Sequence, residues 1–333
     1  MTPNTFSLVA DIGGTNTRCA LAVGPQVQVA TIRRYRNAEH AGLETVIHAF
    51  IDDMDGVDCK GAAVAVAGPV RDGVGTMTNL DWAIDKPTLA RATRAEAVAI
   101  LNDLQAQGQA VGYTDPSNVT RILSGPSGDP GPHAAKLVIG VGTGFNAAPI
   151  WEAEQGRLVP PSECGHANLP IRTERELRLC KYVETAHGFP AVEDVLSGRG
   201  LERVYRFLGA EADDPIEKSA ADIMGSLDSD PRAEEAARFF TKILGTVAGN
   251  LSLIHLPFGG VFLIGGVARA FKDRLIPFGF GEAFRDKGRF AGFMSNFSVS
   301  MIEDDYAALT GLAAHLAREM ANSGNAATDA ERA

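Results

Sequence analysis

FSLVADIGGTNTRCALAV (Phe6–Val23) sets a polar, glycine-containing segment, DIGGTN (Asp11–Asn16), between two short apolar runs. The runs are Phe6–Ala10 and Arg18–Val23, and two such runs joined by a Gly-Gly turn predict a β-hairpin. The segment is not a Walker A loop, because no Gly-Lys-Ser/Thr follows it. It is not the Rossmann fingerprint either, because the glycines lead into a second strand rather than a helix.

The DIGGTN turn carries groups suited to an anion next to a cation. Gly13 and Gly14 have no side chains, so their backbone N–H groups can approach a phosphate closely. Thr15 and Asn16 add hydrogen-bond donors. A carboxylate beside a phosphate repels it unless a cation lies between them, so Asp11 predicts Mg²⁺, bound through water. An ordinary hairpin turn is the alternative, and this turn alone leaves both interpretations open.

A second segment repeats this design after a Gly/Pro/Ser-rich loop, SGPSGDPGP (Ser124–Pro132). Two apolar runs, Lys136–Gly140 and Ala147–Trp151, flank the turn GTG (Gly142–Gly144). One hairpin in each half of the chain suggests a weak internal duplication. The pair favours the phosphate interpretation, because two hairpins that face each other across a cleft can hold one triphosphate.

Strands and helices alternate along the rest of the chain, which predicts an α/β sheet with both faces covered. Further strands are predicted at Val27–Tyr35, Ala62–Ala67, Ala95–Leu101 and within GGVFLIGG (Gly259–Gly266). Helices are predicted at Leu43–Asp52, from Leu104, after Gly266, and at Glu174–Ala186, Leu201–Leu208, Arg232–His255 and Ala307–Met320. We expect the polar tail, Ala321–Ala333, to be disordered and the end of the chain to pack back on the first half.

Composition limits the classes of function. The chain has 333 residues, 45% of them hydrophobic and 22% charged, which is typical of a soluble globular protein of about two domains. A net charge of −10 argues against a nucleic-acid partner. No apolar stretch reaches the ~18 residues of a membrane span, and Met1–Ser7 lacks the features of a signal peptide. The four cysteines lack CxxC spacing, so we expect no zinc site, no disulfides and a cytoplasmic location.

The order of several motifs resembles that of the bacterial glucokinase family, in the hexokinase branch of the actin-like ATPase superfamily. The resemblance covers nearly the whole chain. It rests on VADIGGTNTRCALA (Val9–Ala22), MTNLDWAI (Met77–Ile84), LND (Leu101–Asp103), GTG (Gly142–Gly144), ECGH (Glu163–His166), VLSGRGLERVY (Val195–Tyr205), GGVFLIGG (Gly259–Gly266) and FRDKGRF (Phe284–Phe290). Each motif alone is a weak signal, whereas their order and spacing together are highly specific.

This resemblance implies a two-lobed α/β fold of the actin-like ATPase type, related to ribonuclease H, with a central cleft. Residues 1–113 and 304–333 would form a smaller lobe with the first phosphate loop and the catalytic aspartate. Residues 114–303 would form a larger lobe with the second phosphate loop and the sugar and adenosine contacts. The family also implies a homodimer. The CxCGxxGC zinc motif of the related ROK branch is absent from the sequence, so no metal beyond Mg²⁺ is expected.

The implied activity is glucokinase: ATP-dependent phosphorylation of D-glucose at the 6-hydroxyl, giving glucose 6-phosphate and ADP. The implied ATP contacts are Asp11, Ile12, Gly13, Gly14, Thr15, Gly142, Thr143, Gly144, Gly265 and Gly266, with Asp11 reaching Mg²⁺ through water. The implied sugar contacts are Asn102, Asp103, Glu163, His166 and Glu184. By the same resemblance Asp103 is the general base, which takes the proton of the sugar hydroxyl.

These residue types suit a sugar, but simpler interpretations stay open. Asn, Asp, Glu and His donate or accept in the pairs that sugar hydroxyls need. Asn102 and Asp103 could instead cap the helix predicted from Leu104. Glu184 lies in a predicted helix, where most glutamates face water, and its match needs a two-residue insertion near Gly188–Pro190.

Three positions depart from the pattern that the chain resembles. Asn146 stands where many members have a further glycine, in GTGxG, and its side chain could crowd a phosphate or donate to it. Cys164 replaces a glycine of the usual EGGH, and Asn168 stands where Asp is common. Because the resemblance puts these positions close to both substrates, two alternatives stay open: a kinase for another hexose, such as mannose or fructose, and a catalytically weak sugar-binding regulator.

Overall fold

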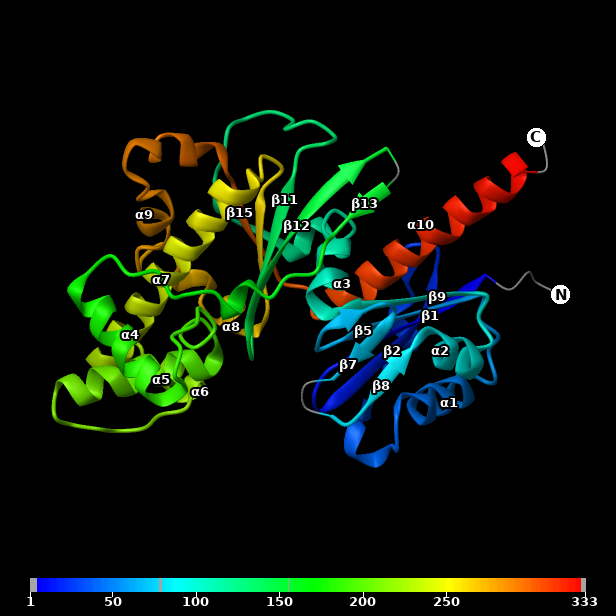
Figure 1. The fold of residues 1–333 in the computed structure, drawn as a ribbon, viewed down its shortest axis with the longest axis horizontal. Helices are drawn as coiled ribbons and strands as arrows, with labels where there is room; N and C mark the ends of the chain where they lie inside the picture. Colours follow the sequence, from blue (N-terminus) through cyan, green and yellow to red (C-terminus); the bar gives the residue numbers. More distant parts are fainter. Residues whose placement is uncertain (1–4, 78–79, 155, 331–333) are drawn as a thin grey trace. The chain divides into compact units, whose positions relative to one another are not determined.

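The computed structural model describes residues 5–77, 80–154 and 156–330 (Figure 1). The chain divides into two compact units. Unit 1 consists of Met1–Asp115, Glu154–Pro161 and Asp304–Ala333, and unit 2 consists of Pro116–Ala153 and Ser162–Glu303. Among the described residues, none of the helices combines the length and the hydrophobicity that crossing a bilayer requires.

The sheet of unit 1 begins with the predicted hairpin, which is confirmed. β1 (Phe6–Ile12) and β2 (Asn16–Val23) pair antiparallel, so the turn between them is only Gly13–Thr15. β5 (Gly61–Val66) and β9 (Ala97–Asn102) continue the sheet beyond β1 as parallel strands. The strand order is β3-β2-β1-β5-β9, with β4 also paired to β2. A small separate sheet contains β6 (Val70–Arg71), β7 (Val74–Thr76) and β8 (Ala83–Asp85).

The single strand predicted over Val27–Tyr35 is wrong. The segment is broken into β3 (Gln26–Val27), a 3-10 turn at Val29–Thr31 and β4 (Arg33–Arg36). The hydroxyl of Thr31 accepts from the Leu21 N–H at 2.9 Å and donates to the Gln28 carbonyl at 2.7 Å. These bonds draw the middle of the segment into a turn against β2, which interrupts the strand.

Helices cover both faces of this sheet, as predicted. They are α1 (Leu43–Asp53), α2 (Lys86–Thr93), α3 (Asp103–Ala110) and α10 (Ala307–Ala330). Leu8 and Ile12 share a core cluster with α1 and α2, whereas Val9 shares one with α3 and α10. Alternate residues of a strand point to opposite faces, so β1 contributes to both layers (Figure 1).

The C-terminal helix corrects the expectation for the tail. The segment Ala321–Ala333 was expected to be disordered, but α10 continues to Ala330, and residues 331–333 lie outside the described residues. Alanines recur through this polar segment, and alanine has the highest intrinsic helix propensity. The low hydrophobicity of this segment therefore did not indicate disorder, because its alanines continue the helix. As expected, the buried part of α10 packs on the sheet of unit 1.

The sheet of unit 2 repeats the strand topology of unit 1. β11 (Lys136–Val141) and β12 (Phe145–Ala153) form the second predicted hairpin, which is confirmed. β14 (Val261–Ile264) and β15 (Val299–Ile302) follow as parallel strands. The order β12-β11-β14-β15 matches β2-β1-β5-β9, which supports an internal duplication. β10 (Val119–Leu123) then pairs antiparallel with β15, and β13 (Gly156–Leu158) belongs to the 154–161 segment of unit 1.

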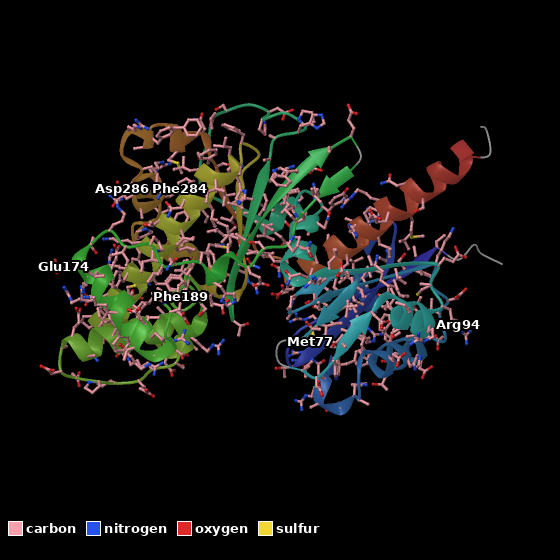
Figure 2. All side chains as sticks on the ribbon, viewed as in Figure 1. Met77, Arg94, Glu174, Phe189, Phe284 and Asp286 are labelled. Carbon is pink, nitrogen blue, oxygen red and sulfur yellow. The ribbon has the colours of Figure 1, made fainter. Side chains whose placement is uncertain are left out.

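The helices of unit 2 pack against this sheet around one large core. They are α4 (Glu174–His187), α5 (Gly198–Glu211), α6 (Ala220–Gly225), α7 (Pro231–His255), α8 (Gly266–Ala270) and α9 (Phe280–Arg285). The predicted helices at α4, α5, α7 and α8 are confirmed, whereas the short α6 and α9 were not predicted. Phe284, which Figure 2 labels, is fully buried and lies 5.9 Å from the ring of Phe280.

Candidate functional site

The first glycine turn is held by Asn37, a side chain only 3% exposed. Its Nδ2 donates to the Gly13 carbonyl at 2.7 Å, and its Oδ1 accepts from the Thr17 hydroxyl at 2.8 Å. The backbone N–H of Asn37 also donates to the Thr15 carbonyl at 3.0 Å. One residue therefore fixes both ends of the turn. Sequence reasoning missed Asn37, because the pairing of β4 with β2 brings it here and no local motif marks it.

One of the predicted phosphate donors is used inside the turn itself. The Gly13 N–H donates to the Asn16 carbonyl at 3.0 Å. A Cβ at Gly13 would lie 3.2 Å from that same oxygen, a tight approach. The expectation that the Gly13 N–H binds a phosphate is therefore not supported by this geometry.

Asp11 lies on β1 directly opposite Arg18 of β2, and its side chain is 20% exposed. Arg18 Nη1 lies 3.5 Å from Asp11 Oδ2. Burial raises the pKa of the Asp11 carboxyl, and the Arg18 charge acts in the opposite sense. A partly exposed carboxylate that already faces an arginine fits a water-mediated contact with Mg²⁺ better than direct ligation. The described ranges contain no cluster of three or more His, Cys, Asp or Glu suited to a metal.

Asn102 and Asp103 form the junction between β9 and α3. Asn102 Oδ1 accepts from the Leu104 N–H and its Nδ2 donates to the Gly68 carbonyl, both at 3.0 Å. Its backbone N–H donates to the Gln105 side chain at 3.1 Å, which completes a capping box. The capping interpretation left open by the sequence is therefore correct for Asn102. Asp103, half-buried at the first position of α3, accepts from the Leu104 N–H at 2.8 Å.

Sheet register brings the first glycine turn and Asp103 to one edge of unit 1. Ile12, Val66 and Asn102 are aligned across β1, β5 and β9. The turn that begins at Gly13 and the carboxylate of Asp103 both follow directly after this aligned row. In parallel α/β sheets, ligands bind at the carboxyl ends of the strands.

The second glycine turn is held by Glu193, which the sequence reasoning did not select. Glu193 Oε2 accepts from the Phe145 N–H at 2.9 Å. A Cβ at Gly144 would lie 2.4 Å from that oxygen, so any side chain there would displace the carboxylate. The Gly198 N–H donates to the Gly142 carbonyl at 3.0 Å, which joins the start of α5 to the turn. The available signal was position: Glu193 stands two residues before the matched stretch VLSG.

The predicted adenosine pair borders this second turn. Gly265 has a φ of +109°, and a Cβ there would lie 2.4 Å from the Val141 carbonyl oxygen. Both features require glycine. Because Val141 directly precedes Gly142, unit 2 brings Gly265 and Gly266 next to the turn Gly142–Gly144.

The ECGH stretch forms a 3-10 turn, Cys164–His166, beside the start of β12. Glu163 Oε2 lies 3.9 Å from His166 Nε2, and both side chains are well exposed. A Cβ at Gly165 would lie 2.0 Å from the Phe145 carbonyl oxygen, and the Gly165 carbonyl accepts from the Glu193 N–H at 2.8 Å. Glu193 therefore contacts both the second glycine turn and the turn that carries Glu163 and His166.

Glu184 belongs to a helix of unit 2 and not to either turn. It is on α4, near the helix end at Gly188, with its side chain exposed. Its predicted contact with the sugar stays a prediction, as do the sugar contacts of Asn102, Asp103, Glu163 and His166. Residues 78 and 79, within the matched stretch Met77–Ile84, lie outside the described residues.

Comparison with known proteins then identifies the family. The family model described as Glucokinase matches residues 8–319, nearly the whole chain. The chain belongs to the glucokinase family. The glucokinase of Sinorhizobium fredii is 32% identical over 310 residues, which cover 92% of this chain and 91% of that relative.

One solved glucokinase structure agrees with this family, and a second, more distant one agrees in fold. The crystal structure of a glucokinase from an Antarctic psychrotroph has a TM-score of 0.82 and 28% identity, and covers 94% of this chain and 98% of its own. A ROK family glucokinase from Streptomyces griseus, in complex with glucose and AMPPNP, is similar in fold, with a TM-score of 0.63, 19% identity and coverage of 94% and 99%. The two-lobed, actin-like α/β fold expected from the sequence is confirmed.

The candidate residues of this member of the glucokinase family fall into two groups. Unit 1 holds Asp11, the first turn, Asn102 and Asp103, whereas unit 2 holds the second turn, Gly265, Gly266, Glu163, His166 and Glu184. Within each unit a glycine turn lies beside predicted sugar residues. That the two groups form one site across a central cleft stays a prediction.

Proposed function

We propose that this protein transfers the γ-phosphoryl group of Mg·ATP to the 6-hydroxyl of D-glucose, giving glucose 6-phosphate and ADP. Family membership over nearly the whole chain supports a sugar kinase. The glucose and AMPPNP in the fold relative from Streptomyces griseus support the two substrates. The observation that carries the mechanism is the edge of the unit 1 sheet, where Asp103 follows the same aligned row of residues as the first glycine turn.

Asp103 is the proposed general base. Phosphoryl transfer to an alcohol needs a group that takes the hydroxyl proton as the new P–O bond forms. The bond from the Leu104 N–H and the Asn102 cap hold Asp103 at the start of α3. A helix N-terminus is also a place where negative charge is electrostatically favourable. Asp103 therefore accepts the C6 hydroxyl proton while the γ-phosphoryl group leaves ADP in line.

The two glycine turns are the proposed phosphate contacts. In the first turn, Gly14 and Thr15 are the proposed donors, since the Gly13 N–H is already paired. In the second turn, Thr143 and Gly144 are the proposed contacts. Mg²⁺ would neutralise charge on the phosphates, and Asp11 would hold it through water.

Asn102, Glu163 and His166 are proposed sugar contacts in addition to Asp103. An amide nitrogen carries two N–H groups, so Asn102 can bind the Gly68 carbonyl with one and a sugar hydroxyl with the other. The exposed pair Glu163 and His166 offers an acceptor and a donor to neighbouring hydroxyls.

A third carboxylate has two candidates. The resemblance gives Glu184, whereas the geometry of unit 2 favours Glu193. Glu193 contacts both the second phosphate turn and the turn after Glu163, and its side chain is only partly buried. We propose Glu193 as the carboxylate at the sugar, with Glu184 as the alternative that mutation must separate.

Coupled measurement of ADP release over a panel of sugars tests the proposed function. Purified protein with Mg·ATP should show the highest kcat/KM with D-glucose, ahead of mannose and fructose. A higher value for another hexose would replace glucose as the substrate. Sugar binding by calorimetry without turnover of any sugar would overturn the kinase assignment in favour of a sugar-binding regulator.

A further inference from the structure

Asn146 and Cys164 are two of the positions that depart from the family pattern. Asn146 follows the second glycine turn, Cys164 lies in the turn with Glu163 and His166, and the two side chains contact each other. We propose that Asn146 is a positioning residue that fixes the loop Ser162–His166, and with it the carboxylate of Glu163, in the orientation that binds the sugar. This inference rests on the proposed function, because it takes Glu163 to be a sugar contact. It assigns Asn146 to the sugar rather than to the phosphate.

The amide of Asn146 holds both peptide groups that flank Glu163. Its Nδ2 donates to the Ser162 carbonyl, which belongs to the peptide group before Glu163. Its Oδ1 accepts at 3.2 Å from the Cys164 N–H, which belongs to the peptide group after Glu163. Two fixed peptide planes leave the residue between them little freedom in φ and ψ. The Cys164 N–H also donates to the Ser162 hydroxyl at 3.2 Å, but of these two side chains Asn146 is the one that contacts both peptide groups and so orients the Glu163 Cα–Cβ bond.

Asn146 is itself well anchored. It lies on β12 opposite Gly140 of β11, so its backbone belongs to a hydrogen-bonded hairpin. Its side chain folds back on its own strand, where Oδ1 accepts from the Ala147 N–H at 2.9 Å. The preceding residue, Phe145, donates its N–H to Glu193 at 2.9 Å. We call the bonds from Asn146 to the Ser162 carbonyl and the Cys164 N–H the clamp. A strand of the core sheet carries it, and a strand positions a binding group better than a loop does.

Cys164 completes the clamp from the loop side. Its Sγ lies 3.5 Å from Asn146 Oδ1 and 4.0 Å from the Ala147 carbonyl. Burial raises the pKa of the Cys164 thiol, so it stays protonated at neutral pH and can donate to these oxygens. Glycine at both positions, as in the pattern that the chain resembles, would remove every one of these side-chain bonds. The two departures therefore act as one unit.

Asn146→Ala tests the clamp, with the KM for each substrate as the readout. We expect the KM for glucose to rise on the order of 10-fold, because a misplaced binding group is costly. The KM for ATP should change less than about twofold, although Asn146 is only two residues from Gly144. The matched control is Asn296→Ala, which also removes one bond from an Asn Nδ2 to a carbonyl, that of Phe293 at 2.8 Å. This control should leave the glucose KM unchanged.

A double-mutant cycle tests the coupling of the two positions. Asn146→Gly and Cys164→Gly are each expected to raise the glucose KM, and the double variant should raise it by less than the product of the two single effects. Coupled losses are expected when both changes break one network. Multiplicative effects in this cycle would contradict a shared clamp. An ATP KM that moves more than the glucose KM would overturn the assignment to the sugar.

Hydrogen–deuterium exchange of the substrate-free protein separates the clamp from the proposed function. Because the Ser162 hydroxyl also accepts from the Cys164 N–H at 3.2 Å, the variants are compared in a Ser162→Ala background. There, exchange of the Cys164 N–H should speed up about 10-fold with Asn146→Ala and stay unchanged with Asn296→Ala. Unaltered exchange would overturn the clamp even if glucose is phosphorylated. If no sugar is phosphorylated while exchange changes as expected, the proposed function fails and the clamp on the loop stands. Asn146→Leu, which removes both the donor and the acceptor and keeps a side chain of similar size, replaces Asn146→Ala should the latter fail to fold.

Discussion

The two hairpins share one strand topology but are secured in different ways. In unit 1 the turn after β1 is held by the neutral amide of Asn37, and the nearby carboxylate, Asp11, belongs to the hairpin itself. In unit 2 the turn after β11 is held by the carboxylate of Glu193, which also contacts the Glu163–His166 turn. The duplicated topology supplies two glycine turns, and different residues secure them. In the proposed mechanism unit 1 would supply the base, Asp103, and unit 2 would supply Glu163 and His166 as sugar contacts.

Loss of the base in unit 1 should have the largest effect. Asp103→Asn keeps the size of the side chain but removes its ability to accept a proton. We expect kcat to fall by about 10²–10⁴-fold with the KM for glucose within a few-fold, because general-base catalysis contributes about this much. Glu163→Gln in unit 2 should instead act mainly on the KM for glucose. Steady-state kinetics of both variants check this contrast, and near-normal turnover by Asp103→Asn would remove the base from the mechanism.

The third carboxylate is the next test of the comparison. Glu193, one of its two candidates, contacts both the second glycine turn and the Glu163–His166 turn. In Glu193→Gln an acceptor for the Phe145 N–H is kept while the charge is lost. We expect kcat/KM for glucose to fall about 10–100-fold, the loss of about 1.4–2.7 kcal/mol of transition-state binding. Glu184→Gln should change it by less than about threefold. The reverse ranking in parallel assays would restore Glu184 as the sugar contact.

Loss of Asn37, whose neutral amide holds the first glycine turn in unit 1, should weaken binding of the nucleotide instead. Asn37→Ala leaves the Thr17 hydroxyl and the Gly13 carbonyl without their partner, which costs about 1–3 kcal/mol of stability. We expect the KM for ATP to rise about 10-fold and the KM for glucose to change little. Thermal unfolding together with both KM values checks this. A lowered Tm with an unchanged ATP KM would show that Asn37 supports the fold and not the phosphate turn.

The smallest expected effect is on the acid stability of unit 2 and concerns Asp230. Burial raises the pKa of its carboxyl, but hydrogen bonds from Lys218 at 2.7 Å and Tyr205 at 2.9 Å outweigh burial and lower that pKa to about 2. A carboxyl with a lower pKa in the folded state stabilises the fold above its unfolded pKa of about 4. That stability, ~1–2 kcal/mol, is lost as the pH falls from about 4 through about 2.

Asp230→Asn is the variant that measures this contribution. Its stability should fall less steeply between pH 4 and pH 2 than that of the wild type in urea unfolding experiments. Equal slopes would mean that Asp230 does not contribute to the acid sensitivity. Asp230 caps α7, accepting from the Arg232 N–H at 2.9 Å, and asparagine is an equally good N-cap, so Asp230→Asn removes the charge and keeps the cap.

The sequence predicted those parts of the fold that short local patterns determine. Both hairpins follow from apolar runs around glycines, and α7 follows from a long helical pattern that Asp230 caps. The strand over Val27–Tyr35 failed because the Thr31 hydroxyl bonds to Leu21, a residue of another strand. The prediction of a disordered tail was wrong because the polarity of the segment was given more weight than the helix propensity of its alanines.

Candidate site residues could be predicted where a sequence motif marks them. They could not be predicted where strand pairing or long-range packing brings them to the site. Asn102 and Asp103 were selected through the resemblance of LND (Leu101–Asp103) to a family motif, and the structure adds that Asn102 caps α3. Asn37 and Glu193 were missed because their contacts arise from strand pairing and from packing between segments distant in the sequence. Asn146 was noted as a departure, but only the three-dimensional contact with Cys164 shows which loop it holds.

Product formation from D-glucose compared with 6-deoxy-D-glucose tests the central claim most directly. The comparison changes only the hydroxyl from which Asp103 is proposed to take a proton. Mass spectrometry after incubation with Mg·ATP should detect a phosphorylated product from D-glucose and none from 6-deoxy-D-glucose, which should still inhibit competitively. A phosphorylated 6-deoxy-D-glucose would contradict transfer to the 6-hydroxyl, and binding of D-glucose without any phosphorylated product would contradict the kinase itself.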